Sequence, residues 1–314
     1  GFLLYGISLL YGATGSTLLP TIISEIQQNG SGNPLVIVGM ALVVVAMSFK
    51  IAIVPFHMWT PDVYTGAPTP VTGFLSGAAK AAGFAVFIRV LMTGIPLEGA
   101  NWENILWLLA VLTMTVGNVM ALRQNEVKRM LAYSSIAHAG YVLVAVVVGS
   151  TSAISGVIFY SCAYALMGTG AFGILTIRDA GRIPRTFDDL AGYGKRNPTL
   201  ALLMSLFIFS LVGLPLTGGF IGKFQIFSAA LQAGWIWLTV IAILNSALSV
   251  YYYLRVVMFM YMREGALPEG SVVSNNTSGF AMTGLLGTAL AVLYLGVFPD
   301  RILELASLSI LALL

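Results

Sequence analysis

The chain has 314 residues, of which 58% are apolar and only 9% are charged, whereas an ordinary soluble domain carries about 25% charged residues. This composition excludes a soluble globular enzyme and predicts an all-α polytopic membrane protein. The net charge of only +3 indicates no nucleic-acid partner. One cysteine and two histidines, His57 and His138, are too few for this chain to build a zinc tetrad or an iron–sulfur cluster.

Apolar runs between turn-forming residues predict nine membrane-spanning helices in one transmembrane domain, since roughly 20 apolar residues cross the hydrocarbon core as a helix. The run at 198–231 is too long for one straight crossing and contains Gly213, Pro215 and Gly219, so we predict a broken helix there. The nine spans are expected at residues 2–19, 34–57, 71–93, 104–122, 127–149, 152–177, 198–231, 235–262 and 279–298.

The loop charges predict the orientation of these spans, because cytoplasmic loops carry an excess of Lys and Arg. If the spans alternate in direction, one side collects the turns near 60–70, 123–128, 178–197 and 263–276, and the other side's loops hold only Arg301. The chain is therefore expected to begin on the cytoplasmic side. The basic residues on that side are Arg123, Lys128, Arg129, Arg178, Arg182, Arg185, Lys195, Arg196 and Arg263.

Five basic residues remain inside the expected spans, where a central charge costs at least about 2.5 kcal/mol. Arg89 and Arg255 lie near span ends and are expected to snorkel to the interface. Lys50, Lys80 and Lys223 are expected well inside the bilayer, yet no Asp or Glu occupies the middle of any expected span. Their carboxylate partners are expected outside this segment, or the lysines exchange protons in a water-filled cavity; a structural ion pair is the alternative.

The two interrupted spans run in opposite directions, and each carries one of these lysines. Lys50 precedes Pro55 in the span at 34–57, and Lys223 follows Pro215 in the span at 198–231. Such a pair is typical of an inverted-topology repeat with its site near the bilayer midplane. Because a helix can break in lipid only where its freed polar groups line a cavity or face protein, the pattern favours an ion path.

The two histidines are candidates for the same path. His57 lies near the cytoplasmic end of its span and either caps loop carbonyls or takes up protons. His138 lies well inside its span and either hydrogen-bonds a neighbouring helix or relays protons. The aromatic residues Tyr251–Tyr253, Trp235 and Trp237 are expected at the membrane interface.

The segment at 49–89 carries a family resemblance. Its stretch VPFHMWTPDVYTGAPTPV resembles the antiporter-like membrane subunits of respiratory complex I. Within it, the motif WTPDVY at 59–64 is similar to that of N-type subunits, the counterparts of mitochondrial subunit 2, rather than to that of L or M types. Further matches are NVMALRQNEVKRMLAYSSIAHAGY at 118–141, GLPLTGGFIGKF at 213–224 and SVYYYLRVV at 249–257. The resemblance runs from the family's sixth helix to its end, so the preceding helices are expected to be absent.

This resemblance implies a proton-translocating subunit of NADH:quinone oxidoreductase that couples quinone reduction elsewhere to proton pumping. It implies that Lys50, Lys80 and Lys223 carry the protons, with His57 and His138 along the polar axis between them. A glutamate on the absent fifth helix would control Lys50. NADH, flavin, iron–sulfur clusters and quinone are expected on other subunits, with no cofactor here.

The implied partners are an M-type subunit, small membrane subunits of the J, K and A types, and lipids. The implied location is a bacterial inner membrane, with an organellar or thylakoid membrane as the alternative. Three other functions stay open: a cation/proton antiporter, a membrane-bound hydrogenase subunit of the same superfamily, and a structural membrane scaffold. An electron donor other than NADH, such as ferredoxin, is also open.

Overall fold

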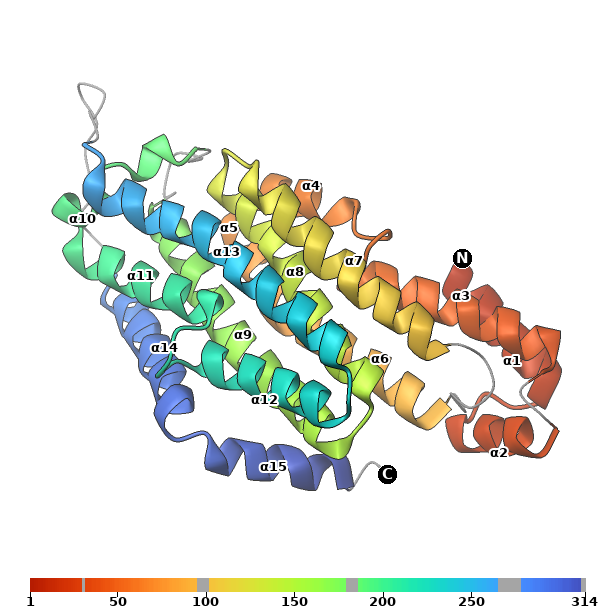
Figure 1. Ribbon diagram of the computed structural model, residues 1–314. Coiled ribbons are helices and arrows are strands. Elements are labelled where there is room, and N and C mark those ends of the chain that lie inside the picture. Colours follow the sequence, from red (N-terminus) through yellow and green to blue (C-terminus); the bar gives the residue numbers. More distant parts are fainter. Residues whose placement is uncertain (30–31, 95–101, 179–185, 265–277, 312–314) are drawn as a thin grey trace.

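The computed structural model describes residues 1–29, 32–94, 102–178, 186–264 and 278–311. Over these residues the protein is a bundle of helices without strands, which confirms the predicted all-α class (Figure 1). In chain order the elements are α1 Phe2–Thr14, α2 Leu19–Asn29, α3 Pro34–Ile51, α4 Trp59–Gly66, α5 Thr69–Phe74, the π-helical turn η1 Leu75–Ala79, α6 Lys80–Gly94, α7 Trp102–Leu122, α8 Val127–Val148, α9 Thr151–Arg178, the 3₁₀ turn η2 Asp188–Leu190, α10 Tyr193–Arg196, α11 Pro198–Val212, α12 Gly218–Gln232, α13 Ile236–Met262, α14 Gly279–Val297 and α15 Asp300–Leu311.

Seven helical spans among the described residues are long and apolar enough to cross a membrane, and α1 with α2 makes an eighth if that bent pair is one span. The count of nine crossings stays a prediction. The expected first span at 2–19 is helical only to Thr14, because Gly15 takes a left-handed conformation with φ 68 and ends α1. The chain then turns by 53° into α2, a helix that the sequence did not predict.

Helix α8 lies in the middle of the bundle, with α1 and α3 at one edge and α14 at the opposite one (Figure 1). Of its apolar window 94% is buried, against 28% to 61% in the other spans. Glycines allow α7 to approach α8 closely: a Cβ on Gly140 would lie 2.6 Å from the Met114 amide, and one on Gly117 would lie 2.6 Å from the Ala137 amide. A buried polar group on α8 must therefore find its partners within the protein.

The first discontinuous helix is α3 followed by α4. Pro55 has no N–H to bond the Ile51 carbonyl, and Ala52 takes a left-handed conformation with φ 64. The freed amide of Val54 donates to Thr113 Oγ1 on α7 at 3.1 Å. Contact with a neighbouring helix therefore pairs this main-chain amide of the break.

The helix boundaries in this region differ from those expected. The helix in the span at 34–57 ends at Ile51, and the expected turn at 60–70 contains α4. Pro61 is tolerated in α4 because it lies in the first turn, where its missing N–H costs no intrahelical bond. The Arg129 guanidinium on α8 also holds α4 by donating to Asp62 Oδ1 at 2.7 Å.

The second discontinuous helix is α11 followed by α12, where a break was expected. Pro215 cannot donate to the Leu211 carbonyl, Gly213 turns the chain with φ 93, and α12 begins at Gly218. The prediction of two discontinuous helices is confirmed. Each break frees polar main-chain groups inside the bundle.

Several turns that were expected on one side of the membrane gather at one end of the bundle. The Phe187 amide donates to the Asn125 carbonyl at 3.1 Å. Arg255 donates to the Gln124 carbonyl at 2.9 Å, and its guanidinium lies 4.1 Å from the Phe187 ring centroid. The Arg255 guanidinium thus joins two of these turns, and its place at the membrane interface stays a prediction. The assignment of this end to the cytoplasm stays a prediction.

Candidate functional site

Lys80 lies deep in the bundle, at the start of α6, directly after the π-helical turn η1. Its side chain is buried, and its ammonium donates to Ser135 Oγ and to the Ser135 carbonyl on α8, both at 2.6 Å. The hydroxyls of Tyr64 and Tyr164 interact with the same serine. All of these groups are neutral, and none of the ion pairs between described residues involves Lys80.

Lys223 occupies the break between α11 and α12. Its buried ammonium donates to the carbonyls of Leu211 and Val212 at 3.0 and 2.8 Å, and to Ser246 Oγ on α13 at 3.1 Å. The Leu211 carbonyl is the group that Pro215 leaves without a helical partner. Lys223 therefore caps the negative end of the α11 dipole with two of its donors and again has only neutral acceptors among the described residues.

Neutral acceptors matter for the chemistry of a buried lysine. A carboxylate partner would hold the charge in place, because losing one member of a buried ion pair leaves the other uncompensated. Carbonyl and hydroxyl groups stabilise the ammonium without creating an anion. Lys80 and Lys223 can therefore lose a proton without leaving a buried anion behind.

His138 lies on α8 between these two lysines, and both of its ring nitrogens have tyrosine hydroxyl partners. Nε2 lies 2.9 Å from the Tyr253 hydroxyl, and Nδ1 bonds the Tyr160 hydroxyl. Tyr253 also bonds Ser134 Oγ. Because a hydroxyl can donate or accept, this series of hydrogen bonds satisfies either tautomer of the imidazole. It is the arrangement needed to pass a proton from one ring nitrogen to the other.

Two tyrosines of this site contradict the sequence analysis. Tyr252 and Tyr253 are fully buried, whereas Tyr251 is exposed. The expectation of three interfacial tyrosines is therefore wrong for two of them. Their helical spacing from Asn245 and Ser249 is the signal that could have found them, because these polar residues share one face of α13.

Small cavities connect the lysines to His138. Lys50 and Lys80 line one cavity of about 20 Å³ together with Thr60 and Tyr64. Lys80 and His138 line a second of about 10 Å³. These volumes, taken as the space open to the centre of a water molecule, are near the size that one water needs.

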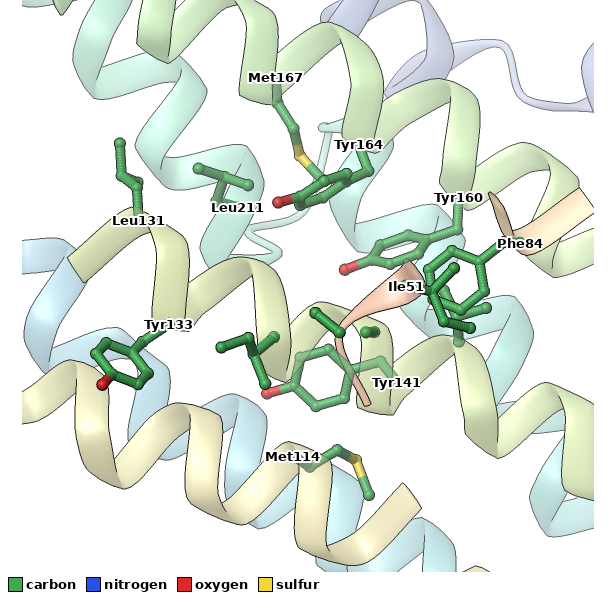
Figure 2. Close-up of a cluster of buried hydrophobic side chains, with 14 of the residues drawn as sticks. Ile51, Phe84, Met114, Leu131, Tyr133, Tyr141, Tyr160, Tyr164, Met167 and Leu211 are labelled. Atoms are coloured by element: carbon green, nitrogen blue, oxygen red, sulfur yellow. The ribbon is translucent and has the colours of Figure 1, made fainter. Parts of the chain in front are cut away.

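The last step of the axis leads from His138 to Lys223 through Tyr141. The His138 and Tyr141 rings meet edge to face with centroids 5.6 Å apart, and the Lys223 ammonium lies 5.0 Å from the Tyr141 ring centroid. Figure 2 shows Tyr141 with Tyr160 and Tyr164, the latter two projecting from α9 toward the same interior space. Sequence analysis missed all three tyrosines.

The remaining candidates lie elsewhere. Lys50, in the last turn of α3, is exposed on the described part of this chain, and its place well inside the bilayer stays a prediction. His57 is buried between α3 and α4, where its side chain interacts with the Pro55 main chain. No hydrogen bond or cavity described above joins His57 to the other candidates. The described residues also contain no group of three His, Cys, Asp or Glu side chains placed to hold a metal ion.

A family model described as NADH:quinone oxidoreductase/Mrp antiporter, TM, matches residues 1–249. The chain belongs to this family. The resemblance to antiporter-like membrane subunits that the sequence predicts is therefore confirmed.

Three relatives of this antiporter family illustrate the likeness. NADH-quinone oxidoreductase subunit N of Trichlorobacter lovleyi is 49% identical over 99% of this chain and 63% of that protein. F(420)H(2) dehydrogenase subunit N of Methanosarcina mazei is 43% identical over 97% of this chain and 63% of that protein. A chain of respiratory complex I from Thermus thermophilus with bound aureothin has a TM-score of 0.80 and 37% identity, covering 96% of this chain and 65% of that one. This chain thus spans somewhat less than two thirds of the length of these relatives.

Proposed function

We propose that the chain is part of an N-type membrane subunit of a proton-pumping NADH:quinone oxidoreductase. In this proposal it moves protons along Lys50, Lys80, His138 and Lys223 and carries no redox centre. Quinone reduction on other subunits supplies the energy. The relatives in Trichlorobacter lovleyi and Thermus thermophilus support this assignment by their names and identity.

One observation carries the proposal: two buried lysines, each held only by neutral acceptors among the described residues, lie on either side of a histidine bonded through both nitrogens. Burying an ammonium in a membrane protein is costly and is seldom retained without a function. A scaffold that needs only fixed charges has no use for an imidazole that is satisfied in either tautomer.

The rest of the path and the surroundings belong to the proposal as well. Lys50, exposed on this chain, meets a glutamate of the preceding helices, and His57 lies at the proton uptake side. The partners are an M-type subunit, the small J, K and A types, and lipids, in a bacterial inner membrane. NADH, flavin, iron–sulfur clusters and quinone bind to other subunits.

A second candidate differs only in the electron donor. The 43% identity to F(420)H(2) dehydrogenase subunit N favours a version in which the same proton path serves a complex oxidising a donor other than NADH. Measuring which reduced donor supports quinone reduction by the purified complex separates the two.

The proposal is tested by Lys80→Met and Lys223→Met in the complete complex. Lys195→Met is the matched control, since that side chain is 76% exposed and pairs with Glu264 at the surface. Both buried variants are expected to lower the number of protons moved per electron in assembled complexes, whereas the control is not. Assembled Met variants that pump at the wild-type ratio would favour the structural scaffold.

A further inference from the structure

The aromatic ring of Tyr141 faces the Lys223 ammonium at 5.0 Å from the ring centroid, within the range of a cation–π interaction. Tyr141 is almost completely buried in the middle of α8, so little water weakens this attraction. The other partners of the ammonium are two carbonyls and one hydroxyl. The ring face is thus the fourth neutral group around Lys223.

A buried hydrogen-bond cluster holds Tyr141 in this orientation. The Asn118 amide on α7 donates to the Tyr141 hydroxyl at 3.1 Å and to Asn245 Oδ1 on α13 at 3.2 Å. The Tyr252 hydroxyl donates to Asn118 Oδ1 at 2.9 Å. Asn118 is completely buried, and the cluster ties α7, α8 and α13 together directly beside Lys223. Such a satisfied network is rigid, because each broken bond would leave a polar group unpaired in an apolar surrounding.

We propose that the ring face of Tyr141 is a binding site for the Lys223 ammonium, and that Asn118 is the residue that positions this ring. The inference rests on the proposed function and names two residues that act in its last step. A ring attracts the ammonium through its quadrupole but carries no net charge. It therefore stabilises the protonated lysine without preventing the proton from leaving.

Asn118 is singled out within the cluster by its bonding. The Tyr141 hydroxyl accepts from the Asn118 amide and also interacts with Ser246, the serine that accepts from the Lys223 ammonium. Removing Asn245 leaves the Asn118 amide free to bond Tyr141 and the Met114 carbonyl. Removing Asn118 takes away the bond to Tyr141 itself, so the two asparagines are predicted to differ although they share the same network.

The variants Tyr141→Phe and Tyr141→Leu, made in the complete complex, distinguish the contribution of the ring from that of the hydroxyl. Lys223→Met defines the full loss of proton movement along this path. We expect the Phe variant to lower proton movement several-fold, as Asn118→Leu does, because the ring is kept but the hydrogen bond that positions it is lost. We expect the Leu variant to lose as much as Lys223→Met. Equal impairment of the Phe and Leu variants, or normal pumping by the Leu variant, would overturn the proposal.

A second measurement applies even if Tyr141→Leu fails to assemble. Phenylalanines carrying one, two or three fluorines are incorporated at position 141; each fluorine weakens the negative ring face while the ring keeps its shape. Proton movement is expected to fall stepwise along this series, by several-fold in total. A flat series in assembled complexes would show that the ring only fills space.

The positioning role is tested by Asn118→Leu against Asn245→Leu. The first is expected to lower proton movement several-fold and to have no additional effect in the Tyr141→Leu background, whereas the second is expected to lower it much less in assembled complexes. Equal effects of both asparagine variants would mean that the cluster only ties helices together. Normal pumping by Lys223→Met would instead refute the proposed function, so the two failures are distinguishable.

Discussion

Gly219 lies where the two halves of the second discontinuous helix, α11 and α12, touch each other. A Cβ at this position would lie 1.9 Å from the Ser210 carbonyl oxygen and 2.8 Å from its carbon, and real Cβ contacts are essentially never shorter than 3.0 Å. The obstacle is main chain, so no side-chain rotation relieves it. We expect Gly219→Ala to displace the start of α12 from α11 by about 1 Å, a displacement that can cost about 100-fold in rate at a functional site.

The displacement reaches Lys223, which lies one helical turn after Gly219 on α12. Its hydrogen bonds to the carbonyls of Leu211 and Val212, now 3.0 and 2.8 Å long, would lengthen beyond the range of a hydrogen bond. Overpacking of this kind also lowers the free energy of unfolding by about 1–3 kcal/mol. Both proton movement and stability are therefore expected to fall.

The assay compares Gly219→Ala with Gly287→Ala in the complete complex. Gly287 lies inside α14, and a Cβ there would meet nothing within 4 Å, so the same substitution is expected to be neutral or stabilising by about 0.5–1 kcal/mol. Proton movement per electron and thermal unfolding in detergent are measured for both. Equal stability and equal pumping of the two variants would refute the argument that the close contact of the half-helices positions Lys223.

Two further predictions concern the first break and the orientation. Thr113→Val leaves the buried Val54 amide unpaired and is expected to lower the free energy of unfolding by about 1–3 kcal/mol. Unfolding is measured in detergent against the control Thr283→Val, because the exposed Thr283 hydroxyl bonds the Phe280 carbonyl of its own helix. Equal stability of the two variants would contradict this prediction. A cysteine at the exposed Thr186 is expected to react with an impermeant reagent only from the cytoplasmic side, and labelling from outside intact cells would overturn the orientation.

Those parts of the fold that local chain chemistry dictates could be read from the sequence. The α11–α12 break follows from Pro215, which has no N–H, and from Gly213, which tolerates positive φ. The burial of Lys80 and Lys223 was expected from their place in long apolar runs, whereas Lys50, in a similar run, is exposed on this chain. These features depend on the residue itself or on its nearest neighbours along the chain.

Features that depend on packing partners could not be read in the same way. Helix α4 lies where a turn was expected, because its residues Pro61 and Tyr64 are buried in the bundle and Asp62 pairs with Arg129 on α8. Tyr253 was expected at the membrane interface, but its hydroxyl is buried and bonds His138 and Ser134 on α8. In each case the deciding group is distant in sequence, so no local pattern indicates it.

The central claim is that Lys80 and Lys223 act by releasing and taking up protons. Lys80→Arg and Lys223→Arg test it most directly, because Arg keeps the charge and roughly the length but stays protonated, its pKa exceeding about 12. The measurement is the number of protons moved per electron in membranes whose assembled complex carries either variant. The account predicts a ratio well below that of the wild type for both. A wild-type ratio for both variants would show that fixed positive charges are sufficient, and would contradict the account.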